Sequence, residues 1–124
     1  MFINFKGAKT YINTGGKNID VDKTTLCFVH GSGQNHLSFV QQSRYFANKE
    51  YSVIVPDLPG HGFSEGVPCV SIKENAEWVS DLVKELNLND IVYLGHSQGC
   101  LTGLELNKNH PKLLKGIIFI AGSN

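Results

Sequence analysis

Residues 95–99 spell Gly-His-Ser-Gln-Gly, and this G-x-S-x-G pattern constrains the fold more than any other part of the chain. The apolar run 91–94 precedes it directly, and a stretch of helical character, residues 98–109, follows it and stops before Pro111. A strand that passes through G-x-S-x-G into a helix is typical of a nucleophile elbow, in which the serine lies on a strained turn. The pattern therefore predicts that Ser97 holds its hydroxyl clear of neighbouring side chains.

The residues around Ser97 fit a role as nucleophile. Gly95 and Gly99 are expected where the backbone of the strand packs too closely on the helix for a side chain. The first N–H groups of that helix would point to the place where negative charge develops during acyl transfer. A serine hydroxyl is a weak nucleophile at neutral pH and needs a base to take its proton. The alternative is that Ser97 is an ordinary helix N-cap, a common role for serine.

A second motif, His30-Gly31-Ser32-Gly33, follows the apolar run 26–29. A strand that ends in H-G-x-G is the usual source of one N–H donor of an oxyanion hole, and the residue after the nucleophile gives the other. We therefore expect the backbone N–H groups of Ser32 and Gln98 to form the hole, with Gly31 or Gly33 as alternatives to Ser32. The competing interpretation of this motif is a plain turn between a strand and a helix.

Strand and helix patterns alternate along the chain, which favours an α/β fold with a parallel sheet. The expected strands are residues 2–5, 10–13, 25–30, 51–56, 91–95 and 114–121, and the expected helices are residues 37–49, 72–86 and 98–109. The second helix begins with the clearest start signal, an S-x-x-E capping box at residues 71–74.

A third segment, residues 56–64, spells Pro-Asp-Leu-Pro-Gly-His-Gly-Phe-Ser after the apolar run 53–55. With the other two motifs, in this order, it resembles the N-terminal half of an α/β-hydrolase-fold enzyme, over essentially all 124 residues. The resemblance implies a mostly parallel sheet with flanking helices that comprises the first six of eight strands. By that count residues 1–124 are a single, incomplete core domain in which the C-terminal strands and the cap are missing.

The resemblance also implies roles for the residues of the three motifs. It implies that Asp57 and His61 shape a loop beside the site, and that the triad acid and base follow Ser97 in the order Ser, Asp or Glu, His. Only Glu105 and His110 follow it, within and at the end of a helix, so we expect the acid and the base to be absent from this chain. The supporting residues are His30, Gly31, Gly33, Gly95, His96 and Gly99, and His36 and His110 are expected to be solvated.

The function implied is that of a serine hydrolase acting on carboxylic esters, thioesters or related acyl compounds through an acyl-enzyme on Ser97. A serine at the elbow argues against dehalogenases and epoxide hydrolases, which use a carboxylate nucleophile. Alone, the chain is expected to be inactive. The alternative is a non-catalytic fragment, a subunit or interaction module that another chain completes. The apolar segment 116–121 would be the edge of the sheet, open to self-association or to a C-terminal half.

The amino-acid composition limits which binding partners and which cellular compartment we expect. The chain has 11 basic and 11 acidic residues, which argues against nucleic acid or an anionic membrane as a main partner. The partner that the resemblance implies is a small-molecule acyl substrate. No apolar run approaches the roughly 20 residues of a membrane span, and the start lacks the pattern of a signal peptide. Cys27, Cys69 and Cys100 are expected to be free thiols in the cytoplasm. Nothing in the sequence calls for a metal or a cofactor.

Overall fold

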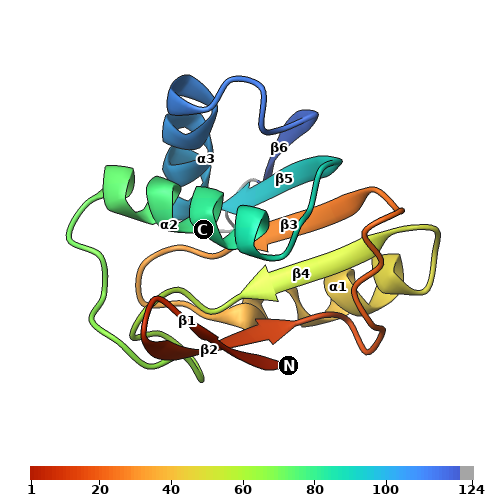
Figure 1. The fold of residues 1–124 in the computed structure, drawn as a ribbon, viewed down its shortest axis with the longest axis horizontal. Coiled ribbons are helices and arrows are strands. Elements are labelled where there is room, and N and C mark those ends of the chain that lie inside the picture. Colours follow the sequence, from red (N-terminus) through yellow and green to blue (C-terminus); the bar gives the residue numbers. More distant parts are fainter. Residues whose placement is uncertain (121–124) are drawn as a thin grey trace.

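The computed structural model describes residues 1–120 and forms a sheet of six strands with helices on both faces (Figure 1). The strands are β1 (Phe2–Phe5), β2 (Ala8–Asn13), β3 (Thr25–Val29), β4 (Ser52–Pro56), β5 (Ile91–His96) and β6 (Gly116–Ile120). The helices are the 3-10 turn η1 (His36–Phe39), α1 (Val40–Ala47), α2 (Ile72–Glu85) and α3 (Gln98–Asn109). In space the strands follow the order β1-β2-β4-β3-β5-β6.

The pairing confirms the predicted α/β class with a mostly parallel sheet. Strands β4, β3, β5 and β6 are parallel, whereas β1 pairs antiparallel with β2, and β2 with β4. Two predicted strand starts differ from the structure by two residues: β2 begins at Ala8 rather than at residue 10, and β6 begins at Gly116 rather than at residue 114. The start of β4 and the ends of β3, β5 and α2 each differ by one residue. The last residue of the predicted strand 114–121 lies outside the described residues.

The helix predicted at residues 37–49 is in fact two pieces. Asn35 caps the 3-10 turn η1, because its side-chain oxygen accepts the N–H of Leu37, and the α-helical part begins only at Val40. Because the first turn is tight, His36 and Phe39 both face the interior. The helical period predicts this for Phe39 but not for His36, which precedes the predicted helix.

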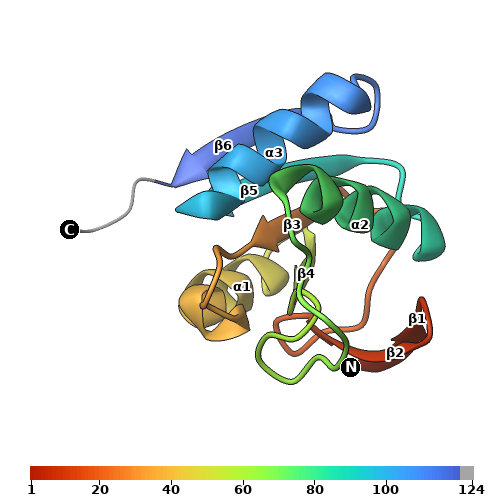
Figure 2. The ribbon, with the colours of Figure 1, turned by 90° about the vertical axis from the view of Figure 1, so that its left-hand side faces the viewer.

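Alternate side chains of the central strands pack into two apolar clusters, one on each face of the sheet. From β3, Cys27 and Val29 join the cluster under α2 and α3, while Leu26 and Phe28 join the cluster under α1. Figure 2 shows the same division, with α1 on one side of the sheet and α2 and α3 on the other. Burial on both faces explains why these strands are continuous apolar runs.

The chain order of the strands brings three loops together at one edge of the sheet. From β3 the chain passes to β4 on one side, and α2 then carries it back across β3 to β5 on the other side. The loops that follow β3, β4 and β5 therefore meet at the carboxyl ends of the parallel strands. In open α/β sheets this is the edge where ligands bind.

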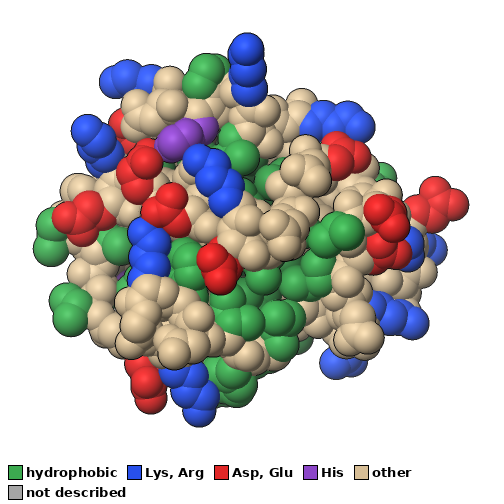
Figure 3. Space-filling model, in the orientation of Figure 1, with side chains coloured by type: hydrophobic (Ala, Val, Ile, Leu, Met, Phe, Trp, Pro, Cys, Tyr) green, Lys and Arg blue, Asp and Glu red, His purple; other side chains and the backbone are tan. Residues whose placement is uncertain are grey.

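No helix within residues 1–120 is both long and apolar enough to cross a membrane. Figure 3 shows one face of the molecule, on which Lys and Arg side chains lie interspersed with Asp and Glu side chains. This mixture agrees with the equal numbers of acidic and basic residues in the sequence.

Candidate active site

Ser97 lies between β5 and α3 with a backbone conformation that is rare for any residue except glycine. Its φ is 57° and its ψ is −126°, and the residue is exposed. A conformation of this kind costs about 1–3 kcal/mol and persists only where the surrounding structure enforces it. The predicted elbow is therefore present in the backbone, with the serine at its apex.

The backbone of Ser97 also argues against a plain N-cap. An N-cap residue has an extended backbone and accepts an N–H of the first turn with its side chain. Ser71 does this at the start of α2, with φ −149° and its Oγ 3.1 Å from the Glu74 nitrogen. The Ser97 side chain makes no such bond at the start of α3. Its hydroxyl is thus left free for another task.

Two glycines make the elbow possible. A methyl group on Gly95 would lie 2.6 Å from the carbonyl oxygen of Gly99, and one on Gly99 would overlap the carbonyl oxygen of Val29. Since these obstacles are backbone atoms of neighbouring elements, they cannot give way. The first turn of α3 is therefore pressed against the ends of β5 and β3, as the sequence predicted.

Tyr93 packs against the first turns of α3 next to the elbow, a role that was not predicted from the sequence. Its hydroxyl donates a hydrogen bond to the Gly99 carbonyl at 2.6 Å, and its ring fills the space where a side chain on Gly103 would stand. Burial raises the pKa of the Tyr93 phenol well above its usual value, so the group stays a neutral donor. The only sign of this role in the sequence was a tyrosine within the otherwise aliphatic run 91–94.

The loop after β3 offers three backbone N–H groups, and each has a different acceptor. Gly31 donates to Gln34 Oε1 at 3.0 Å, Gly33 donates to His61 Nε2 at 3.1 Å, and Ser32 donates to Gln98 Oε1 at 3.2 Å. Only the Ser32 N–H thus points at the residue that follows the nucleophile. This geometry favours Ser32 over Gly31 and Gly33 as the second donor of an oxyanion hole.

Gly31 and Gln34 join this loop to the elbow. A methyl group on Gly31 would lie 3.2 Å from the Ser97 Cβ and 3.1 Å from the Gln98 nitrogen. Gln34 Oε1, besides accepting the Gly31 N–H, lies 3.3 Å from His96 Nδ1, which must carry the proton of that contact. His96 is thus bound to the loop after β3 through Gln34, and the sequence contained no sign of this part played by Gln34.

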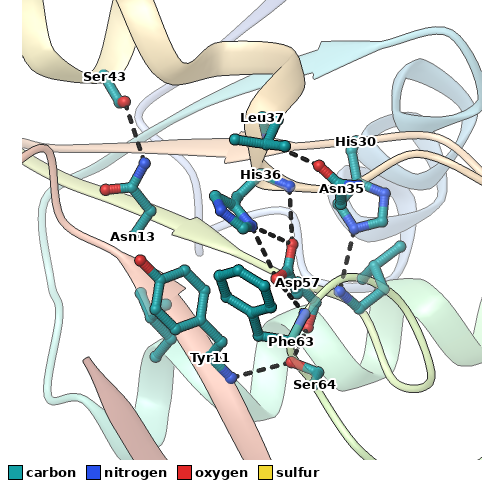
Figure 4. A network of polar contacts seen from close by, with 12 residues as sticks. Tyr11, Asn13, His30, Asn35, His36, Leu37, Ser43, Asp57, Phe63 and Ser64 are labelled. Atoms are coloured by element: carbon teal, nitrogen blue, oxygen red, sulfur yellow. Dashed lines mark hydrogen bonds and ion pairs between the residues drawn. The ribbon is translucent and has the colours of Figure 1, made fainter.

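The loop after β4 is built around a fully buried carboxylate, Asp57 (Figure 4). The backbone N–H of His36 donates to it at 2.7 Å, the ring Nδ1 of His36 at 2.8 Å, and the Phe63 N–H at 2.9 Å. The structural role expected of Asp57 agrees with these bonds. The expectation that His36 is solvated is wrong: its residue exposure is 5%, because the 3-10 turn directs its ring at Asp57.

None of the five histidines, all of which lie within residues 1–120, bonds to the Ser97 hydroxyl. His30, His36, His61 and His96 are bound to the loop groups around them, and His110 Nε2 lies 2.8 Å from a carboxylate oxygen of Glu77. Glu105 accepts a bond from Asn109. The described residues thus bring together a candidate nucleophile and candidate oxyanion donors, but no candidate base bonded to Ser97.

A cavity of about 310 Å³ adjoins the Ser32 and Gln98 pair. The loop after β4 and the start of α2 form its walls, and its lining contains no Lys, Arg, Asp or Glu side chain. The residues that line it are Ser32, Leu58, His61, Pro68, Cys69, Val70, Ser71, Ile72, Asn75 and Gln98. Its size lies near the lower end for sites that hold small organic ligands.

The three thiols are poor candidates for a nucleophile. Burial raises the pKa of the Cys27 thiol to about 12, and burial, followed by the charge of Glu74, raises the pKa of Cys69. A raised pKa lowers the thiolate fraction and with it the reactivity. The Cys100 Sγ donates to the Gly95 carbonyl at 3.3 Å. All three cysteines are free, as predicted.

Comparison with known proteins places these motifs in a family. The family model described as alpha/beta hydrolase fold matches residues 24–124. The chain is 31% identical to the (E)-2-((N-methylformamido)methylene)succinate hydrolase of Acinetobacter baylyi over 78% of this chain and 37% of that protein. It is also 31% identical to the pimeloyl-[acyl-carrier protein] methyl ester esterase of Proteus mirabilis, over 82% of this chain and 37% of that protein.

The solved structure of Est816, an N-acyl homoserine lactone degrading enzyme, superimposes with a TM-score of 0.80 at 27% identity. The match covers 99% of this chain and 46% of that one. The chain spans about two fifths of the length of the curated relatives. With the matched family model over four fifths of its length, the chain belongs to the alpha/beta hydrolase fold family.

Proposed function

We propose that this chain supplies the nucleophile and the oxyanion hole of a serine hydrolase that acts on carboxylic esters, thioesters or related acyl compounds. The observation that carries the proposal is the strained backbone of Ser97, which leaves the hydroxyl uncommitted at the start of α3. The name of one relative, a methyl ester esterase, supports this class of reaction, and the name of another gives a hydrolase.

In the proposed reaction the Ser97 oxygen attacks the acyl carbon while a base takes the hydroxyl proton. The negative oxygen of the tetrahedral intermediate accepts hydrogen bonds from the backbone N–H groups of Gln98 and Ser32. Each such donor is worth about 3–4 kcal/mol of transition-state stabilisation. Collapse expels the alcohol or thiol, which takes up the proton, and water then releases the acid from the acyl-enzyme. The uncharged cavity beside Ser32 suits an uncharged part of the substrate.

The proposed base is a histidine outside this chain's own five, because each of those rings is bonded elsewhere. We therefore expect residues 1–124 alone to be inactive toward activated esters. Removing triad members leaves only about 10³–10⁴-fold acceleration over the reaction in water. Robust hydrolysis by the isolated chain that is lost in Ser97→Ala would overturn this part of the proposal and make a resident histidine the base.

A fluorophosphonate probe tests the nucleophile in the complete protein. The expected adduct is on Ser97 alone, and Ser97→Ala should abolish it. Ser32→Ala is a matched control, because it removes a neighbouring hydroxyl and keeps the backbone N–H that we assign to the oxyanion hole. Labelling of Ser32, or of the buried Ser64, in place of Ser97 would reject the assignment.

The second candidate, a module completed by another chain, is favoured by the outer edge of β6. Among the described residues β6 pairs only with β5, and Ile118 and Phe119 are each 50% exposed. Unpaired strand edges with apolar side chains are templates for a further strand. We propose that a strand of a C-terminal half covers this edge, whether or not the assembly is catalytic.

A cytoplasmic location, based on the three free thiols, remains a prediction.

A further inference from the structure

Two histidines tie the loop after β3 to the loop after β4 in a reciprocal way. His61 Nδ1 lies 2.9 Å from the Pro59 carbonyl oxygen, and its Nε2 accepts the Gly33 N–H at 3.1 Å. His30 Nδ1 lies 2.7 Å from the Gly31 carbonyl oxygen, and its Nε2 accepts the Leu58 N–H at 3.1 Å. Each ring thus holds its own loop through Nδ1 and the other loop through Nε2.

These contacts fix the protonation of both rings. A carbonyl oxygen only accepts, so Nδ1 must carry the hydrogen in each case, and a backbone N–H only donates, so Nε2 must be bare. Both rings are therefore neutral and share one tautomer. Their centroids lie 5.2 Å apart, and we call this pair the histidine clasp.

The clasp holds the peptide unit that carries the Ser32 N–H and the unit after it, because His30 bonds to the Gly31 carbonyl and His61 accepts the Gly33 N–H. The Gly31 nitrogen, one residue before it, is anchored by Gln34, and the Gly33 nitrogen, one residue after it, is anchored by His61. Gly33 is exposed and has a φ of 78°, and a methyl group there would meet nothing within 4 Å. A side chain would thus meet open space at Gly33, and within residues 1–120 the Gly33 N–H is held by its bond to His61.

We propose that His61 is a positioning residue of the oxyanion hole, which sets the place of the Ser32 N–H through Gly33 and releases it when the His61 ring is protonated. The inference rests on the function proposed above, since it needs Ser32 to be a donor. His61 touches no reacting atom in this scheme. It affects the rate only by setting the position of the loop after β3, which carries the Ser32 N–H.

Protonation removes the acceptor, because an imidazolium carries hydrogen on both nitrogens. The titratable groups close to the clasp are Asp57 and His36, which are bonded to each other, and the Cys69 thiol, which lines the same cavity as His61. The α2 and α3 residues that line the cavity are uncharged. Burial lowers the pKa of His30. Protonation of the His61 ring would break its bond to Gly33 and open that side of the clasp.

The first test compares His61→Leu with His61→Gln in the complete protein, using a short p-nitrophenyl ester. His61→Leu should lower kcat by about 10–100-fold with little change in KM, because a misplaced donor weakens only the transition state. His61→Gln should recover part of the loss, since its amide oxygen can accept the Gly33 N–H. The fall of kcat/KM at acid pH that is due to His61 should disappear in His61→Leu.

His110→Leu is the matched control: its ring pairs with Glu77, away from both loops, so kcat and the pH profile should stay unchanged. Equal kcat and an equal acid limb in His61→Leu and the unchanged protein would overturn the proposal. Circular dichroism establishes that the variants are folded.

Nitrogen-15 NMR of the histidine rings tests the clasp without any need for turnover. We expect His61 with hydrogen on Nδ1 and a bare Nε2 at pH 8, and a Gly33 amide signal that moves in step with the His61 titration. The opposite tautomer, or a Gly33 signal that does not follow His61, would overturn the proposal. Turnover that survives Ser97→Ala would instead reject the proposed function and leave the NMR result standing.

Discussion

The backbone nitrogen of Ser32 lies 3.2 Å from the Oε1 atom of Gln98, so the side chain of one candidate oxyanion residue occupies the donor of the other. The amide oxygen of Gln98 stands where a substrate oxygen would accept the same N–H. In the proposed oxyanion hole a substrate would have to displace this oxygen, so Gln98 would be an internal competitor as well as a donor.

The competition predicts opposite effects for two Gln98 variants. Gln98→Met keeps the backbone N–H and the approximate shape but removes the competing oxygen. Because the substrate then no longer has to break a hydrogen bond worth about 1 kcal/mol, kcat/KM should rise roughly fivefold. Gln98→Glu should lower kcat/KM by tenfold or more at neutral pH, because a carboxylate binds the N–H more tightly. Steady-state kinetics of the complete protein that show the reverse order would contradict this prediction.

Gly99→Ala should destabilise the fold, because its methyl group would overlap the backbone carbonyl of Val29. Overpacking of this kind typically costs about 1–3 kcal/mol. Gly116→Ala is the matched control, since a methyl group there meets nothing within 4 Å. Urea unfolding of both variants gives the comparison, and equal midpoints would mean that the elbow is less tightly packed than the structure indicates.

Tyr93→Phe should lower the free energy of unfolding by about 1–3 kcal/mol, because the buried Gly99 carbonyl loses the hydroxyl that satisfies it. Tyr45→Phe, at an exposed tyrosine, should change stability by less than about 0.5 kcal/mol. Thermal and urea unfolding measure the difference. If the two substitutions cost the same, the bond to Gly99 contributes nothing.

Stability should fall as the pH drops below the ordinary histidine pKa of about 6.5, owing to His30. Burial lowers the pKa of His30 in the folded state, so the unfolded chain binds a proton at a pH where the folded chain does not. Linkage then makes the free energy of unfolding decrease with falling pH, by at most about 1.4 kcal/mol per pH unit for one group. Unfolding series between pH 7.5 and 5.5 measure the slope, which should be shallower in His30→Gln. A slope that His30→Gln leaves unchanged would assign the effect to other groups.

The open edge of β6 predicts association of the 124-residue chain. Ile118→Lys places a charge on that edge and should reduce dimerisation or aggregation in sedimentation experiments. Val21→Lys is the control, because Val21 is 49% exposed and lies in the segment before β3. A stable monomer over a wide concentration range, unaffected by Ile118→Lys, would show that the edge has no such role.

The elbow and the order of the elements could be predicted because each depends on local spacing. The pattern around Ser97 and the apolar runs 26–29 and 53–55 fix strands and turns within a few residues of themselves. The bond between His36 and Asp57 could not be predicted, since the two residues are 21 positions apart and meet only because η1 is a tight turn. The same holds for Gln34, whose side-chain oxygen meets Gly31 of its own loop and His96, which is 62 positions away.

The packing of Tyr93 against Gly103 has a consequence for how this part of the chain can vary in length. The tyrosine ring occupies the notch left by one particular glycine, so an insertion or deletion anywhere from residue 93 to residue 103 would shift a bulky helix residue onto the ring. Val67 and Val70, in the loop before α2, are more than four-fifths exposed and fill no such notch. Differences in chain length should therefore accumulate before α2 and be absent around the nucleophile.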